Sequence, residues 1–285
     1  MALAPTIGPT MTYAAILTHV QIDSDTAPRL ACAVDMAEKF RAALIGVGAE
    51  MIPPLAFDGG VYSVQADWAT AMRETIEENL AGARKTFVSA ARELGARAVW
   101  CSGIELPTPA VAAASRAADL IVAGGAPRRR RDSYREASAA DLALTSGRPV
   151  LVAPSQGPAL KAERIVLAWK DTREARRALS DALPFFEQAE LVEVVEICHA
   201  SDIDQAVIRV EDVVGALKRR GVRAAAKVVE HAHGAPDALL QEALKLGADL
   251  VVAGCYGHSR LGEWVFGGFT ERLIEQDCLY VLLSH

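Results

Sequence analysis

The sequence contains two copies of one pattern, and this repeat constrains the fold more than any other feature. Ala118-Asp-Leu-Ile-Val-Ala-Gly124 returns as Ala248-Asp-Leu-Val-Val-Ala-Gly254, at an offset of 130 residues. At the same offset, residues 148–153 align with residues 278–283. The beginnings of the copies match at a larger offset, near 150, so the first copy is longer in its middle by about twenty residues. Such a repeat predicts two similar domains.

A turn-rich segment separates the two copies. Residues 154–158 are Pro-Ser-Gln-Gly-Pro, and proline and glycine at this density mark a joint between structural units. We therefore expect an N-terminal domain over residues 1–157 and a C-terminal domain over residues 158–285.

Strand and helix patterns alternate within each copy. Short apolar runs predict buried strands, and longer amphipathic stretches predict helices. The expected strands are Ala14–Val20, Ala43–Gly48, Ala98–Cys101, Leu120–Ala123 and a fifth within 148–153, then Ile165–Trp169, Leu191–Ile197, Ala225–Val229, Leu250–Ala253 and Leu279–Leu283. The expected helices are Asp25–Phe40, Asp67–Leu94, Ala110–Ala117 and Ser138–Ser146, then Arg173–Leu183, Asp204–Arg220, Pro236–Leu246 and Thr270–Gln276. This alternation predicts parallel sheets with right-handed crossovers.

One stretch near the end of the chain predicts an anion-binding loop. Gly254 and Gly257 follow the apolar run Leu250–Ala253, and Gly267 and Gly268 precede the last helix. Glycines let the backbone turn sharply and approach a ligand, and the start of a helix offers free N–H groups to an anion. In an open sheet of order 3-2-1-4-5, this loop leaves strand four beside strand one, where ligands bind. We therefore expect a phosphate cradle made mostly of main chain.

Composition and charge argue against several classes of protein. The net charge is −6, which disfavours nucleic acid as the main partner. No apolar run reaches membrane-spanning length, and Met1–Thr10 has neither the basic residue nor the long apolar core of a signal peptide. The five cysteines include no CxxC pair, as expected for reduced thiols. We expect a cytoplasmic protein that binds neither nucleic acid nor membrane.

The spacing Gly254-x2-Gly257-x9-Gly267 resembles the nucleotide-binding signature of the universal stress protein family, in which a serine or threonine follows the third glycine. The flanking Ala248-Asp-Leu-Val-Val-Ala and Thr270-Glu-Arg-Leu-Ile are also similar to that family. Because two copies cover nearly the whole length, the chain resembles a tandem member. The resemblance implies an α/β protein of two flavodoxin-like (Rossmann-like) domains, each a five-stranded parallel sheet of order 3-2-1-4-5 flanked by helices.

The same resemblance implies a function. It implies that the C-terminal domain binds an adenine nucleotide, ATP above all and with or without Mg²⁺, as a stress-response signalling module. Members of the family associate through their fifth strands, so the two copies are expected to form a pseudo-dimer within the chain. A homodimer and an unidentified protein partner are further expectations, and no structural metal is expected.

Twelve residues are assigned to the nucleotide by this resemblance. They are Gly254, Gly257, His258, Arg260, Gly267, Gly268, Phe269, Thr270, Ala168, Trp169, Lys170 and Val194. Gly268 stands where the family has serine or threonine, so one hydroxyl is missing, although Thr270 remains as a donor. Lys170 stands where the family commonly has an aspartate, and Asp171 comes one residue late.

Several of these residues have a second interpretation. Lys170 and Arg260 are either phosphate contacts or solvated loop charges. Ala168 and Val194 line an adenine pocket or belong to the sheet core.

The first copy departs further from the signature. Pro127 replaces the second glycine and removes a donor N–H, and Ala137 replaces the third, although Ser138 keeps the hydroxyl position. We expect this copy not to bind nucleotide in the family's manner. Arg128–Arg131 form a solvated loop or contact an anion. The insertion over residues 51–94 caps this copy's crevice or forms a partner surface.

Strong catalysis is not expected. The sequence lacks a GxSxG elbow and a Walker GK[ST] loop, so ATP hydrolysis, if it occurs, should be slow. Cys198-His199 and His231-Ala-His233 follow neighbouring strands and form a weak candidate for a zinc site. A scaffold that works without nucleotide and a weak ATPase remain alternatives to the regulatory nucleotide-binding module.

Overall fold

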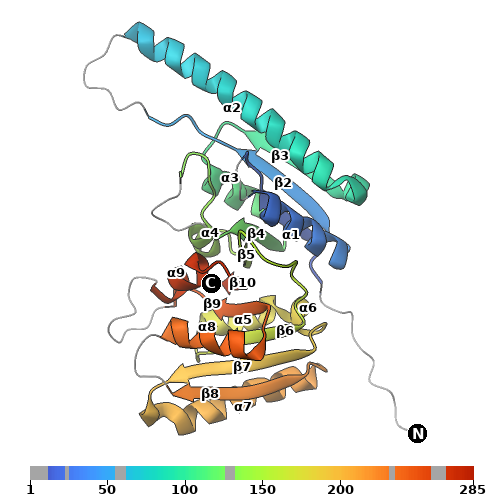
Figure 1. Cartoon of the computed structure of the whole chain (residues 1–285), viewed down its shortest axis with the longest axis vertical. Coiled ribbons are helices and arrows are strands. Elements are labelled where there is room, and N and C mark those ends of the chain that lie inside the picture. Colours follow the sequence, from blue (N-terminus) through green and yellow to red (C-terminus); the bar gives the residue numbers. More distant parts are fainter. Residues whose placement is uncertain (1–11, 23–25, 55–61, 126–131, 231–234, 258–267) are drawn as a thin grey trace.

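The computed structural model describes residues 12–22, 26–54, 62–125, 132–230, 235–257 and 268–285. Their strands form one ten-stranded sheet of order β3-β2-β1-β4-β5-β10-β9-β6-β7-β8, with helices on both faces (Figure 1). The strands of the first half are β1 (Ala15–His19), β2 (Ala43–Ala49), β3 (Ala98–Gly103), β4 (Leu120–Gly124) and β5 (Val150–Ala153). Those of the second half are β6 (Arg164–Ala168), β7 (Leu191–Cys198), β8 (Ala224–Glu230), β9 (Leu250–Gly254) and β10 (Tyr280–Ser284).

Each half has the predicted strand order. The first half runs 3-2-1-4-5, and the second half shows the same order in its own strands, all of them parallel. Strand register reproduces the sequence repeat, because Ile16 pairs with Leu120 in the first half and Ile165 pairs with Leu250 in the second. The predicted flavodoxin-like fold, in two copies, is confirmed.

The helices occupy the predicted positions, with different ends. They are α1 (Thr26–Lys39), α2 (Tyr62–Ala90), α3 (Pro107–Ala114), α4 (Ala139–Thr145), α5 (Arg173–Asp181), α6 (Leu183–Phe186), α7 (Ile203–Arg219), α8 (Ala235–Leu246) and α9 (Gly268–Glu275). The expected helix Arg173–Leu183 ends two residues early, and a separate turn follows with Pro184 near its start. The expected helix Asp67–Leu94 ends at Ala90, and Gly95 has a positive φ of 57°.

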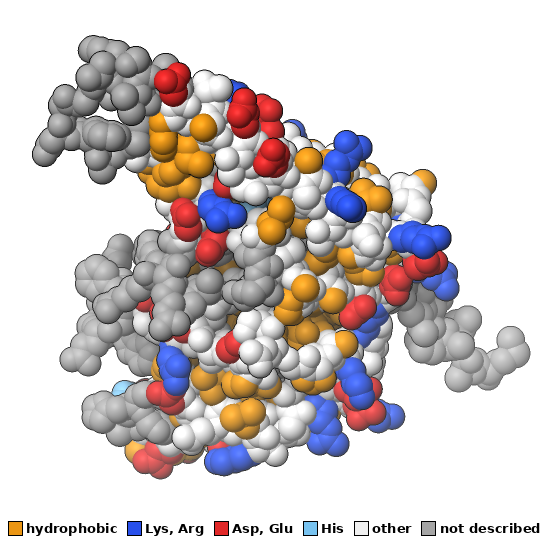
Figure 2. Space-filling view, turned by 45° about the horizontal axis from the view of Figure 1, so that its top comes forward, with side chains coloured by type: hydrophobic (Ala, Val, Ile, Leu, Met, Phe, Trp, Pro, Cys, Tyr) orange, Lys and Arg blue, Asp and Glu red, His pale blue; other side chains and the backbone are white. Residues whose placement is uncertain are grey.

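The insertion of the first half is mostly the long helix α2. It lies beside β2 and β3 at one end of the sheet (Figure 1). Phe87 packs on Trp100 of β3 with ring centroids 5.4 Å apart, and Ile76 and Ala83 are buried on the same stripe. The outer face is charged, with acidic side chains in view on the helix at the top of Figure 2. The described part of α2 therefore extends the core over the sheet edge.

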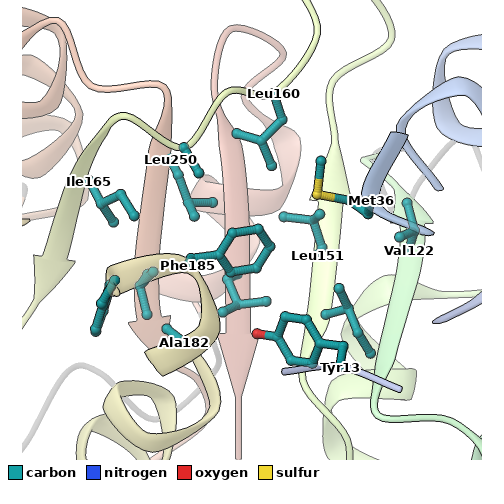
Figure 3. Close-up of a cluster of buried hydrophobic side chains, with 14 of the residues drawn as sticks. Tyr13, Met36, Val122, Leu151, Leu160, Ile165, Ala182, Phe185 and Leu250 are labelled. Atoms are coloured by element: carbon teal, nitrogen blue, oxygen red, sulfur yellow. The ribbon is translucent and has the colours of Figure 1, made fainter. Parts of the chain in front are cut away.

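The two halves join through their fifth strands. β5 and β10 pair antiparallel, with Leu151 opposite Leu282. Tyr13, Phe40 and Phe185 meet beside this pair, with ring centroids 5.0–5.5 Å apart. The Tyr13 hydroxyl donates to the Asp181 carbonyl, and Figure 3 shows Tyr13 and Phe185 facing each other across the junction. The predicted pseudo-dimer within the chain is present.

Candidate functional site

The candidate site lies at the carboxyl ends of β6 and β9. These strands are direct neighbours, and Ala168 of β6 pairs with Ala253 of β9. Residues that follow the two strands, Trp169 and Gly254, therefore leave the sheet at the same edge. The strand order alone places them there, as in other open parallel sheets.

The turn after β9 needs glycine at its first position. An ideal Cβ on Gly254 would lie 2.5 Å from the backbone N of Ala175, at the start of α5. No side chain fits into that space, so the end of β9 and the start of α5 touch through their main chains. The Cys255 N–H donates to the carbonyl of Ser284 at 2.9 Å, and Tyr256 has a φ of 54°. These contacts set the direction in which the chain leaves the sheet.

Gly257 faces a carboxylate that the sequence did not reveal as part of the site. An ideal Cβ on Gly257 would lie 2.8 Å from Oε2 of Glu174, whose side chain is 7% exposed. Arg173 Nε donates to the other carboxylate oxygen at 3.1 Å. Thr172 caps the helix by accepting the Ala175 N–H. An acidic residue in the first turn is common in helices, so nothing in the local pattern singled out Glu174.

Glu174 is a carboxylate rather than a carboxylic acid. Burial raises its pKa, but hydrogen bonds from its own backbone N–H, Arg173 and Thr172 outweigh burial and hold the pKa below its ordinary value. Its charge, after the larger effect of burial, helps raise the pKa of the neighbouring Cys255 thiol to about 12. Cys255 is therefore a neutral, unreactive thiol at this edge.

The start of α9 is open at the position where a hydroxyl is missing. Among the described residues, no atom lies within 4 Å of an ideal Cβ on Gly268. Phe269 is half-buried, and Thr270 is buried at 3% exposure. His258, Arg260 and Gly267 lie outside the described residues, so they stay predictions.

The candidate residues in or directly after β6 and β7 lie in different surroundings. Val194 is fully buried in the core cluster that α5 and α7 cover, whereas Ala168 is half-buried against the opposite cluster. Lys170 is exposed. Trp169 is 8% exposed, and its indole N–H has no partner among the described residues. A buried donor of this kind ordinarily has an acceptor, so the assignment of Trp169 to a ligand stays a prediction that this N–H makes worth testing.

The first half has a different side chain at the matching place. An ideal Cβ on Gly124, the counterpart of Gly254, would lie 2.9 Å from Nη1 of Arg29. Arg29 is 8% exposed; its Nε donates to the His19 carbonyl and its Nη2 to Thr26 Oγ1. The small cavity beside them, lined in part by His19, Arg29 and Gly124, has a volume of about 10 Å³. That volume suits about one water molecule, not a nucleotide.

The other candidates in the first half have structural roles or lie outside the description. The Ser138 hydroxyl accepts the Asp141 N–H and so caps α4, while Ala137 is half-buried. Pro127 and Arg128–Arg131 lie outside the described residues.

Metal and membrane sites find no support in the described part of the chain. Among the residues described, no group of three or more His, Cys, Asp or Glu side chains could hold a metal ion. Cys198 is half-buried and His199 is exposed, while His231 and His233 are outside the description. None of the helices described combines the length and the apolar character that crossing a membrane requires.

Comparisons with known proteins point to one fold. No model of a known protein family and no curated protein matches the chain. A universal stress protein from Archaeoglobus fulgidus DSM 4304 matches with a TM-score of 0.67 at 16% identity, over 95% of each chain. A protein described as a universal stress protein, from Pseudomonas aeruginosa UCBPP-PA14, has a TM-score of 0.55 at 15% identity, over 95% of this chain and 93% of that one. A functionally unknown protein from Pseudomonas aeruginosa PAO1 matches with a TM-score of 0.53 at 14% identity, over 95% of this chain and 92% of that one.

Proposed function

Because this chain has the tandem fold of the universal stress proteins, we propose that its second half, residues 158–285, binds an adenine nucleotide, ATP in the first place. The observation that supports this most is the Gly254–Gly257 turn at the carboxyl end of β9, directly beside β6. Residues 1–157 form the partner domain, in which the Arg29 side chain lies against Gly124. The protein acts as a stress-response regulatory module.

Three features of the described residues support this proposal. The glycine turn after β9, apart from the Cys255 N–H that already donates to the Ser284 carbonyl, and the backbone N–H groups at the start of α9 suit an anion. The buried Trp169 indole N–H suits an acceptor atom of a ring or ribose. No atom of the described residues fills the space beside Gly268, which suits a phosphate close to the helix. Together these features fit a ligand that has both a polar ring and a phosphate.

Catalysis is weak in this proposal. A general base works best with a pKa near the operating pH, and the pKa of Glu174 is instead lowered. The Cys255 thiol, with a pKa of about 12, is no nucleophile at neutral pH. Neither group is suited to activating water, so bound ATP persists and its presence is the signal.

A second function, a scaffold that works without nucleotide, is favoured by one specific observation. The Glu174 carboxylate lies against Gly257, in the turn to which the first proposal assigns a phosphate. A negative charge beside the turn opposes the binding of a negatively charged group.

Thermal unfolding with ATP, ADP, AMP and adenosine separates the two functions. A ligand at about 100 times its dissociation constant adds about 2.7 kcal/mol to the free energy of unfolding, so the melting temperature rises. Gly257→Val should abolish the rise by placing a side chain in the turn. Gly103→Val is a matched control at the end of β3, in the other half. An ideal Cβ on Gly103 also lies 2.8 Å from a carboxylate oxygen, in this case that of Glu105.

The control should keep the full rise in melting temperature. If no nucleotide stabilises the wild-type protein, the scaffold is the better account. If Gly257→Val is stabilised as much as wild type, the nucleotide binds elsewhere.

A further inference from the structure

We propose that Glu174 selects the charge state of the ligand: its carboxylate opposes a free nucleotide phosphate and makes the site prefer the Mg²⁺-bound nucleotide. This inference rests on the proposed function and deepens it. It goes beyond the glycine signature, because Glu174 belongs to α5 and lies outside the signature altogether.

The Glu174 side chain lies beside both glycines of the turn after β9. Its Cβ would lie 2.9 Å from an ideal Cβ on Gly254, and its Oε2 lies 2.8 Å from the corresponding point on Gly257. One side chain thus lies against both glycines that leave β9. A phosphate held by the N–H groups of this turn would be its direct neighbour.

The charge of Glu174 is only partly balanced. Its described cationic partner is Arg173, whose side chain is 74% exposed and is therefore screened by water. Cys255, the nearest buried ionisable group after it, is neutral. Arg176 and Arg177 on the same helix pair with Asp171 and Asp181 instead. A negative charge therefore remains beside the turn.

The first half has a different neighbour at the matching glycine. Gly124 and Gly254 are counterparts in the repeat, and each lies against the helix that follows the first strand of its half. The atoms nearest to an ideal Cβ on Gly124 belong to the Arg29 side chain, whereas those nearest to one on Gly254 are main-chain atoms of Glu174 and Ala175 and the Glu174 Cβ. The carboxylate beside the second-half turn therefore comes from Glu174 itself and can be changed by substitution.

A divalent cation resolves the conflict in the second half. Mg²⁺ is bound by carboxylate and phosphate oxygens together, and it cancels the charge that each presents to the other. A nucleotide that arrives with Mg²⁺ therefore meets much less repulsion at Glu174 than free ATP does, because the cation lowers the negative charge of the phosphates and can bind the carboxylate. Adenosine, without phosphate, should be indifferent to this residue.

Isothermal titration calorimetry tests the inference with three ligands: ATP with EDTA, ATP with Mg²⁺, and adenosine. We compare wild type, Glu174→Gln and Glu190→Gln. Glu190 is exposed and directly precedes β7, so it lies at the amino ends of the strands, whereas the site lies at their carboxyl ends. Its substitution changes the net charge equally and leaves the site untouched. Glu174→Gln should bind free ATP about tenfold more tightly than wild type, because it removes the repulsion between the carboxylate and the phosphates. A tenfold change in affinity corresponds to about 1.4 kcal/mol of binding free energy.

The same variant should lose most of the wild-type preference for Mg²⁺-bound over free ATP, while adenosine affinity stays within about twofold. Glu190→Gln should behave as wild type with all three ligands. Thermal unfolding checks that the variants are folded, and Glu174→Ser, which also suits the first turn of a helix, repeats the measurement should Glu174→Gln unfold.

Two results overturn the inference in different ways. If wild type binds ATP and Glu174→Gln binds free ATP no more tightly, Glu174 does not select charge, and the proposed function stands. If neither protein binds ATP or adenosine under any condition, the proposed function fails and the inference fails with it.

Discussion

At the scale of single residues, glycines decide what can lie at the carboxyl edge of the second half. Gly254 is required by the backbone of α5, which leaves no room for a side chain. Gly257 is required less strictly, because the nearest atom belongs to the flexible end of Glu174. Packing against the described residues does not require Gly268. The three glycines of one motif are therefore required to three different degrees by their surroundings.

Gly268 allows a test by gain of binding. Gly268→Ser restores the hydroxyl of the family's signature at a position with no described atom within 4 Å of an ideal Cβ. A hydrogen bond to a charged group contributes about 1.5–3 kcal/mol, so ATP should bind about tenfold more tightly. Gly268→Ala is the matched control, since it fills the same space without a hydroxyl and should change affinity by about twofold at most. Equal affinities of the serine and alanine variants, measured by calorimetry, would exclude a phosphate next to this position.

At the scale of elements, α8 is tied to the edge strand β8 by a buried carboxylate. Glu242 of α8 is 7% exposed and pairs with Lys227 of β8 at 2.5 Å and with Lys245 at 2.6 Å. The hydrogen bond from Lys227, followed by the one from Lys245, lowers the pKa of Glu242 against the effect of burial. An edge strand has a partner on one side only, so this ion pair contributes to holding β8.

This pair predicts a pH-dependent stability. The pKa of Glu242 is lower in the folded than in the unfolded protein, so its stabilisation is present above the unfolded value, near 4.5, and is lost as pH falls through the folded value. Glu242→Gln should cost about 1–2 kcal/mol at pH 7, discounted for the exposure of both lysines, and much less at pH 3. Urea unfolding at the two pH values measures this. Glu211→Gln, on the exposed face of α7, should be neutral at both, and a pH-independent cost for Glu242→Gln would contradict the assignment.

At the scale of the whole molecule, the two halves share one sheet and one aromatic junction. The β5–β10 pair continues the sheet across the repeat, and Phe185, fully buried, contacts Tyr13 and Phe40 from the other half. Neither half can lose this junction without exposing apolar surface of the other. Unfolding of one half is therefore coupled to the other.

Phe185→Ala tests that coupling. Truncating a buried phenylalanine costs about 3–5 kcal/mol. We expect faster amide exchange in β1 of the first half as well as in β6 of the second. Phe87→Ala is the control, because Phe87 is equally buried but contacts Trp100 at the far edge. Phe87→Ala should lower the free energy of unfolding by a similar amount and leave amide exchange in β6 unchanged. Faster amide exchange in the second half of that variant would mean that the coupling does not run through the junction.

Sequence reasoning was most successful where a pattern is local or repeated. Buried strands show as apolar runs, and all ten predicted strands are present. Helix ends were less accurate, as at Ala90 and Asp181, because the last turns depend on what the helix packs against. The twelve assigned nucleotide residues remain predictions. The structure adds the surroundings of each residue that it describes, such as the core position of Val194 and the indole N–H of Trp169, which has no partner among the described residues.

The sequence alone determined the repeat, the alternation of strands and helices, and the place of a glycine turn after β9. These follow from short-range periodicity and from the spacing of two copies. Only the tertiary structure decided that the Glu174 carboxylate lies against that turn, and that the Arg29 side chain lies against Gly124 in the first half. Both side chains come from helices far from the glycines in sequence, and no local pattern encodes such a contact. The charge at this end of the sheet depends on it.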